Sequence, residues 1–192
     1  MAPKAESWKF DRSYREYFTL RDETRVLIRC LRAEDREKIL EGFDHLSSTS
    51  RYLRFLTPKP LLSDEELRFF TEIDGLNHFG IVAVETARDG SEGPGVAVAR
   101  FLRLADDPAS AEPAITVVDE MQGQGVGKAL FERLVAAARE RGIRRFRCYI
   151  LAENRRGQEL VHYFFPTAHF ELRGEVFVAE FPITGVPKAG RG

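Results

Sequence analysis

A strand, a glycine-rich loop and a long amphipathic helix follow one another directly in the second half of the chain. The strand is the apolar run EPAITVV at 112–118, and the helix is KALFERLVAAARERG at 128–142. The segment between them carries glycines at 123, 125 and 127. Glycine lets main-chain N–H groups approach a ligand closely, and a helix N-terminus adds unpaired N–H groups and partial positive charge. This arrangement predicts an anion-binding turn.

Three kinds of phosphate-binding loop contain such glycines. A P-loop needs GxxxxGK followed by Ser or Thr, but here Gln122 stands at the first glycine and Ala129 at the hydroxyl position. A dinucleotide loop needs GxGxxG, and Lys128 replaces its third glycine. The third pattern, Q/R-x-x-G-x-G/A, is satisfied by Gln122, Gly125 and Gly127. We therefore favour the third pattern.

Hydrophobic periodicity along the rest of the chain predicts one mixed α/β domain. Strands are expected near residues 17–20, 25–31, 79–86, 96–104, 112–118 and 143–151, with two more within 169–181. Helices are expected at 32–43, 47–56, 63–73, 128–142 and 153–164. Ser47 or Ser50 is the expected cap of the second helix, and Ser63 with Glu66 forms a capping box for the third. Pro166 is expected to end the last helix.

The domain boundaries follow from composition. Residues 1–16 are polar and are expected to form a flexible arm, residues 17–185 a single domain, and residues 186–192 a flexible tail. No internal linker divides the chain.

The composition of the chain argues against several kinds of partner. Lys plus Arg number 29 and Asp plus Glu 30, so no excess of cations is available for nucleic-acid phosphates. The two cysteines, Cys30 and Cys148, form no CxxC motif or Cys/His cluster that would indicate zinc. No apolar run reaches the ~18 residues of a membrane span, and the N-terminus lacks the apolar stretch of a signal peptide. We expect a cytoplasmic protein with no metal, nucleic-acid or membrane partner.

The motif at Gln122, Gly125 and Gly127, followed by a helix, a strand, Asn154 and a further helix, resembles the acyl-CoA-binding motif of the GNAT superfamily of N-acyltransferases. The segments TLRDETRVLIRCLRAED, LSSTSRYLRFL and LSDEELRFFTEID look like the acetyltransferase domain of bacterial protein lysine acetyltransferases. The resemblance implies the GNAT fold, an α/β (α+β) arrangement in which a mostly antiparallel sheet of about seven strands is flanked by about four helices. It also implies acetyl-CoA as cosubstrate, a protein lysine or small-molecule amine as acceptor, and a monomer or homodimer.

The resemblance places the diphosphate of acetyl-CoA on the N–H groups of the glycine loop. The residues implied are Gln122, Gly123, Gln124, Gly125, Val126, Gly127 and Lys128. The thioester arm is expected along a strand that diverges from its neighbour, at Thr116, Val117 and Val118, where one N–H would polarise the thioester carbonyl. Asn154 corresponds to an asparagine that contacts the coenzyme arm, and it is also placed to cap the next helix. Lys128 either contacts a coenzyme phosphate or lies in solvent.

Glu112 is the candidate general base. An acceptor amine such as lysine has a pKa of about 10.4, so it is protonated at neutral pH and must lose a proton before it attacks. In the lysine acetyltransferase relatives a glutamate lies ten residues before the motif, and Glu112 has this spacing from Gln122. Asp119 and Glu120 are alternatives. Tyr163 is the candidate general acid, but it lies two residues beyond the position where many relatives have a tyrosine, and aromatic packing also explains it.

Two functions from different classes follow from these residues. One is direct transfer of acetyl to an amine in a ternary complex, without a covalent thiol intermediate, because Cys30 and Cys148 have no partnering histidine. The other is a catalytically silent acyl-CoA-binding sensor or interaction module, which the displaced tyrosine favours. Glu112 favours the enzyme.

Overall fold

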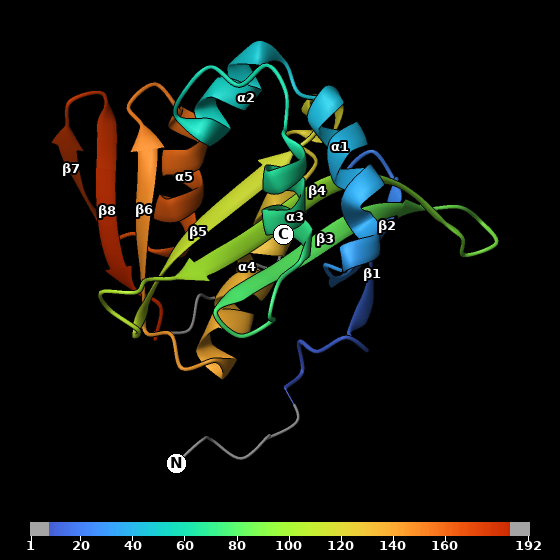
Figure 1. Ribbon diagram of the computed structural model, residues 1–192, viewed down its shortest axis with the longest axis horizontal. Helices are drawn as coiled ribbons and strands as arrows, with labels where there is room; N and C mark the ends of the chain where they lie inside the picture. The colour runs from blue at the N-terminus through green and yellow to red at the C-terminus, as the bar shows by residue number, and fades with distance from the viewer. Residues whose placement is uncertain (1–7, 185–192) are drawn as a thin grey trace.

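Hydrogen bonds join eight strands into one sheet in the computed structural model, which describes residues 8–184 (Figure 1). The strands are β1 (Arg15–Thr19), β2 (Arg25–Cys30), β3 (His78–Thr86), β4 (Glu92–Arg103), β5 (Ser110–Val117), β6 (Arg145–Leu151), β7 (His169–Arg173) and β8 (Val176–Pro182). Their order is β1-β2-β3-β4-β5-β6-β8-β7, and every neighbouring pair is antiparallel except β5 and β6. The predicted mostly antiparallel sheet is confirmed, with the eight strands that the periodicity predicts and one more than the family resemblance implies.

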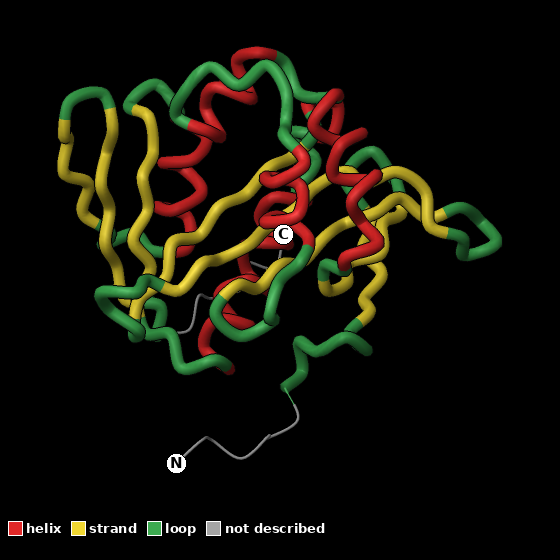
Figure 2. The backbone as a smooth tube through the Cα atoms, viewed as in Figure 1, coloured by secondary structure: helices red, strands yellow, loops and turns green. Residues whose placement is uncertain are grey.

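Helices cover both faces of this sheet (Figure 2). They are α1 (Arg36–Asp44), α2 (Ser48–Phe55), α3 (Asp64–Thr71), α4 (Val126–Glu140) and α5 (Arg155–Phe164), with short 3₁₀ turns at Ala33–Asp35 and Asp119–Met121. The first three helices share a small apolar core, whereas α4 and α5 pack into the main core. Along β4, Ala99 and Phe101 face the main core and Arg100 faces α3, as the period of a strand requires.

The segment before β1 packs onto the domain, where the sequence predicts a flexible arm. Phe10 and Tyr14 are 2% and 7% exposed, and their rings lie 4.6 Å apart. Nη2 of Arg141 donates to the Phe10 carbonyl at 2.8 Å. The arm is therefore anchored by aromatic burial and by contact with the end of α4, and β1 begins inside it. Residues 1–7 and the expected tail at 186–192 lie outside the described residues.

Local signals set the helix boundaries as predicted. The Ser47 hydroxyl accepts the Ser50 N–H at 3.1 Å, and Ser63 and Glu66 form the capping box of α3. The last helix, α5, ends before Pro166, which cannot continue it.

His78, the first residue of β3, is a buried neutral histidine. His78 is 8% exposed, and its ring centroid lies 4.8 Å from that of Phe69. Its Nε2 atom has no hydrogen-bond partner among the described residues. Burial, and to a smaller extent the positive charge of Arg100, lower the pKa of His78 to about 4, although Asp74 opposes this shift.

We expect the free energy of unfolding to fall as the pH is lowered from 6.5 to 4. The unfolded chain binds a proton at His78 near pH 6.5, whereas the folded state resists protonation until about pH 4. The difference is at most about 3 kcal/mol. Chemical denaturation of His78→Gln should show a flatter pH profile, whereas His169→Gln, at an exposed position, should keep the wild-type slope. Equal slopes in the two variants would contradict the assignment.

Candidate active site

The parallel strands β5 and β6 are paired only at their first residues. The ladder joins Ser110 to Arg145 and Ala111 to Phe146, and then it stops. Beyond these pairs β5 stays paired with β4, and β6 stays paired with β8. A gap therefore opens between the two strands, and the main-chain groups that face it lack sheet partners.

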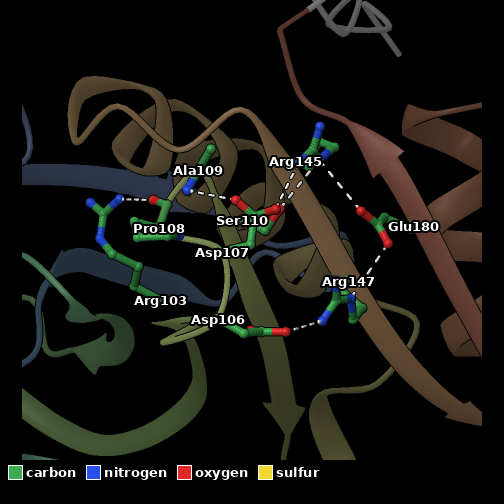
Figure 3. A network of polar contacts seen from close by, with 9 residues as sticks. All are labelled: Arg103, Asp106, Asp107, Pro108, Ala109, Ser110, Arg145, Arg147 and Glu180. Carbon is green, nitrogen blue, oxygen red and sulfur yellow. Dashed lines mark hydrogen bonds and ion pairs between the residues drawn. The ribbon is translucent and has the colours of Figure 1, made fainter.

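A network of charged side chains holds the closed end of this gap (Figure 3). The carboxylate of Asp107 accepts hydrogen bonds from Nη2 of Arg145 at 2.7 Å and from the Ser110 hydroxyl at 2.6 Å. Glu180 on β8 lies 3.4 Å from both Arg145 and Arg147. The loop before β5 is thus tied to β6 and β8, which fixes the point where β5 and β6 separate.

Of the three residues expected to offer the thioester a donor, Val117 is the one whose N–H faces the gap. The Val118 N–H donates to the Val96 carbonyl of β4 at 3.0 Å, and Thr116 lies opposite Val98 in the same register. Since residues of an antiparallel pair alternate between the two edges of a strand, Val117 directs its N–H away from β4. The other two, Thr116 and Val118, are turned toward β4.

The glycine loop presents a continuous set of unpaired N–H groups. The N–H groups from Gly123 to Lys128 have no acceptor among residues 8–184. Gly123 and Gly125 have φ angles of +79° and +96°, which glycine adopts without strain, and a Cβ on either would meet no atom within 4 Å. Gly127 lies in the first turn of α4, close to Val117, where a Cβ would lie 3.6 Å from a methyl group. The loop is an open cradle at a helix N-terminus, which suits a diphosphate.

Hydrogen bonds from Arg21 and Gln122 hold the loop in place. Nη1 of Arg21 donates to the Gly123 carbonyl at 3.1 Å. The Gln122 side-chain amide donates to the Val117 carbonyl at 3.2 Å and to the Asp119 carboxylate at 3.1 Å, so Gln122 connects the loop to β5. Nothing in the sequence pattern identifies Arg21 as a loop contact, because it lies in the distant turn between β1 and β2.

Glu112 is the first residue of β5 beyond the pairs that join β5 to β6. Its side chain is exposed and belongs to the face that α2 covers, where Nε of Arg54 donates to the Thr116 hydroxyl at 3.1 Å. Partial burial raises the pKa of Glu112, and the charge of Arg54 opposes this shift. The carboxylate is therefore a stronger base than an ordinary glutamate. The alternative base Asp119 instead accepts a hydrogen bond from Gln122. Burial raises the pKa of Asp119, but hydrogen bonds from Ser47 and Ser50 outweigh it and leave the pKa below the usual value.

Tyr163 and Lys128 lie against each other at the start of α4. Nζ of Lys128 is 3.5 Å from the centroid of the Tyr163 ring, which also packs edge-on to Phe164 at 5.0 Å. No contact joins Tyr163 to Glu112 in the described part of the chain. The tyrosine predicted as an acid thus lies at the loop end of the site, as a half-exposed ring under an ammonium group.

Asn154 caps α5, one of the two roles expected for it. Its Oδ1 accepts the Gly157 N–H at 2.9 Å. Its side-chain nitrogen donates to no group among residues 8–184, so that N–H remains free to meet a ligand.

Neither cysteine is suited to act as a nucleophile. Burial raises the pKa of the Cys30 thiol to about 11 and raises that of Cys148 further.

Residues 8–184 contain no group of three or more His, Cys, Asp or Glu side chains that could hold a metal ion. None of the helices in this range is long and apolar enough to cross a membrane.

Comparison with known protein families agrees with this geometry. The model of the acetyltransferase (GNAT) domain matches residues 25–162, which include β5, the glycine loop and most of α5. The chain belongs to the GNAT acetyltransferase family. This GNAT domain is accordingly classed with the acyl-CoA-dependent acyltransferases.

Two acetyltransferases are similar to the GNAT domain in sequence. Acetyltransferase Pat of Mycolicibacterium smegmatis is 36% identical over 121 residues, which are 62% of this chain and 34% of Pat. Acetyltransferase PA5475 of Pseudomonas aeruginosa is 31% identical over 142 residues, which are 74% of this chain and 75% of that protein. The chain spans only 34% of the length of Pat.

Solved structures share the same fold. The GNAT domain of S. lividans PAT has a TM-score of 0.78 and 29% identity, over 90% of this chain and 99% of that one. The structure of yncA from Salmonella typhimurium, solved with acetyl-CoA, has a TM-score of 0.64 and 17% identity, over 85% of this chain and 98% of that one.

Gly125→Ala should weaken coenzyme A binding at least about tenfold, because alanine is strained at this positive φ and would shift the loop from the conformation that presents its unpaired N–H groups. Gly90→Ala is the matched control, since Gly90 has a φ of +85° in the distant turn between β3 and β4. Isothermal titration calorimetry with coenzyme A compares the two. A normal affinity in Gly125→Ala would argue against the loop as the diphosphate site.

Proposed function

We propose that this GNAT domain transfers an acetyl group from acetyl-CoA to a primary amine, which attacks directly within a ternary complex. One observation carries the proposal: the unpaired edge of β5 begins at Glu112 and leads into the unpaired N–H groups from Gly123 to Lys128. A basic carboxylate and an anion cradle therefore lie at the two ends of one open strand edge. The acetyl-CoA in the yncA structure supports the choice of donor.

The coenzyme supplies an activated acetyl thioester, and the chain supplies its binding. The N–H groups of the glycine loop bind the diphosphate, with Gln122 and Arg21 keeping the loop in place. The Val117 N–H donates to the thioester carbonyl oxygen, where negative charge develops during transfer. Asn154 donates its free side-chain N–H to the coenzyme arm.

Glu112 removes the proton that the acceptor amine must lose. Its raised pKa makes it a better base, while its exposure allows the proton to pass on to water. The leaving thiolate resembles that of cysteine, with a pKa of about 8.5, so it departs without a strong acid. We therefore assign Tyr163 a packing role beside Lys128 at the coenzyme end of the site.

Glu112→Gln should lower kcat by about 10²- to 10⁴-fold, because the amide cannot accept the proton. Its affinity for coenzyme A should stay at the wild-type value, since Glu112 lies outside the glycine loop. Glu120→Gln, at an exposed position beside the loop, is the control and should retain kcat. The assay is release of coenzyme A from acetyl-CoA with a panel of primary amines and lysine peptides.

Two results distinguish failure of the base from failure of the function. Equal turnover in Glu112→Gln and wild type would remove Glu112 from its role. Tight binding of coenzyme A without turnover on any acceptor would replace the enzyme by the silent sensor module.

A further inference from the structure

Among residues 8–184 the buried arginines are Arg29, Arg100 and Arg141, and Arg54 is half-buried. Arg29 and Arg141 are fully partnered. Arg29 is 2% exposed and forms two hydrogen bonds with Asp35, at 2.6 and 2.8 Å, and two with Glu92, at 2.7 and 3.0 Å. Arg141 donates to three main-chain carbonyls, and its guanidinium lies 4.1 Å from the centroid of the Phe79 ring. These two cations show how this protein normally satisfies a buried positive charge.

Arg54 and Arg100 differ from that pattern. Arg100 is 7% exposed, yet within residues 8–184 it forms one hydrogen bond, from Nη1 to the Phe70 carbonyl at 3.1 Å, and its guanidinium lies 4.4 Å from the centroid of the Phe70 ring. Arg54 donates from Nε to the Thr116 hydroxyl and has no further hydrogen bond in the described part of the chain, and its guanidinium lies 4.9 Å from the centroid of the Phe55 ring. Neither forms an ion pair with any carboxylate of residues 8–184.

The two cations also repel each other. Burial, and next the charge of Arg54, lower the pKa of Arg100 to about 9, and burial lowers that of Arg54. Buried charges are ordinarily compensated by an opposite charge and by hydrogen bonds, because desolvation is costly. Within residues 8–184, Glu112 is the acidic group whose charge opposes the shift in the pKa of Arg54, and the two side chains form no ion pair.

Both guanidinium groups line one cavity of about 60 Å³ between α1, α2, α3 and the sheet. Its other walls are largely apolar, with Phe43, Phe55 and Phe70 among them. Two further charged residues line it: Lys38, which donates to the Gly93 carbonyl, and Asp35, whose charge is paired with Arg29. By this measure one water molecule needs about 10–15 Å³, so the cavity accepts a group of a few heavy atoms. The cavity is too small for a second helix or strand, and its charge suits a small anion.

The cavity adjoins the proposed transfer site on the acceptor side. Arg54 bonds to Thr116, which precedes Val117 and shares its face of β5 with Glu112. The coenzyme arm is proposed to lie in the gap between β5 and β6, within the plane of the sheet. A second substrate therefore approaches Glu112 from the face that α1, α2 and α3 cover, where the cavity lies.

We propose that the acceptor is a small amine that also carries a carboxylate, and that Arg54 and Arg100 bind this carboxylate while the amine faces Glu112. The proposal rests on the acetyltransferase function above and narrows its acceptor. A guanidinium pair favours a planar carboxylate, to which it offers parallel N–H donors. A cationic amine without a carboxylate would meet two uncompensated positive charges, whereas an amino acid brings the compensating negative charge with it.

The test compares acceptors in pairs that differ only in the carboxylate: lysine with cadaverine, phenylalanine with phenethylamine, and alanine with ethylamine. We expect kcat/KM for coenzyme A release to be at least about tenfold higher for the carboxylate-bearing member of each pair. Arg54→Met and Arg100→Met should each reduce that ratio toward one. Arg36→Met is the control and should keep the ratio, because Arg36 pairs with Asp64 at the surface. Calorimetry with coenzyme A reports whether each variant is folded.

The outcomes separate the two proposals. Equal turnover within every pair would overturn the carboxylate site and leave the acetyltransferase function intact. If no amine turns over, the function fails, and the site is then judged by the rise in Tm with each amino acid at fixed coenzyme A. A rise that Arg100→Met abolishes supports the site, and no rise with any amino acid overturns it.

The same carboxylate chemistry has a second possible source, the acyl group of the donor. Succinyl-CoA and acetyl-CoA are therefore compared with one carboxylate-free amine. A preference for succinyl-CoA that Arg54→Met and Arg100→Met remove would place the carboxylate on the donor and overturn the assignment to the acceptor.

Discussion

A parallel ladder of two residue pairs, Ser110 with Arg145 and Ala111 with Phe146, lies between two antiparallel parts of the sheet. Ion pairs of Asp107 and Glu180 hold this short junction, so the strands separate at a fixed position. Everything proposed for the site uses the gap that follows. The gap exposes the inner edge of β5, directs the Val117 N–H into it and sets Glu112 at its closed end.

An open strand edge and a loop of unpaired N–H groups are unfavourable for folding, because main-chain groups inside proteins are almost always paired. The domain carries this cost at the proposed site. Other parts of the fold satisfy their polar groups in several places, as in the capping box of α3 and in the anchored N-terminal segment, whose Phe10 carbonyl is paired with Arg141. Such a contrast is typical of a binding site whose ligand completes the missing hydrogen bonds.

The buried arginines show the same contrast in charge. Arg29 and Arg141 stabilise the fold, because carboxylates or carbonyls satisfy them inside the protein. Arg54 and Arg100 line a cavity next to the proposed base, and each has one hydrogen bond, to the Thr116 hydroxyl and to the Phe70 carbonyl, with no carboxylate partner among residues 8–184. Two cations in this setting lower the stability of the isolated domain, and a bound carboxylate would restore it. We therefore assign the pair to binding of the substrate and not to stabilisation of the fold.

The sequence by itself determined the elements and the loop. Its periodicities located the strands and helices, its capping residues set the starts of α2 and α3, and the glycines at 123 and 125 permitted the positive φ angles that open the cradle. These features are local, because each depends on residues a few positions apart. The position of Glu112 before the motif was also visible, although its role stays a prediction.

Only the tertiary structure decided how distant residues meet. Strand register directs the Val117 N–H into the gap and the N–H groups of Thr116 and Val118 toward β4, because successive residues of a strand face opposite edges. Packing across the sheet anchored the segment expected to be a flexible arm and brought Arg54 and Arg100 to one cavity, from elements far apart in the chain. Composition and spacing do not record such contacts, since burial, register and the proximity of distant charges arise only when the layers assemble.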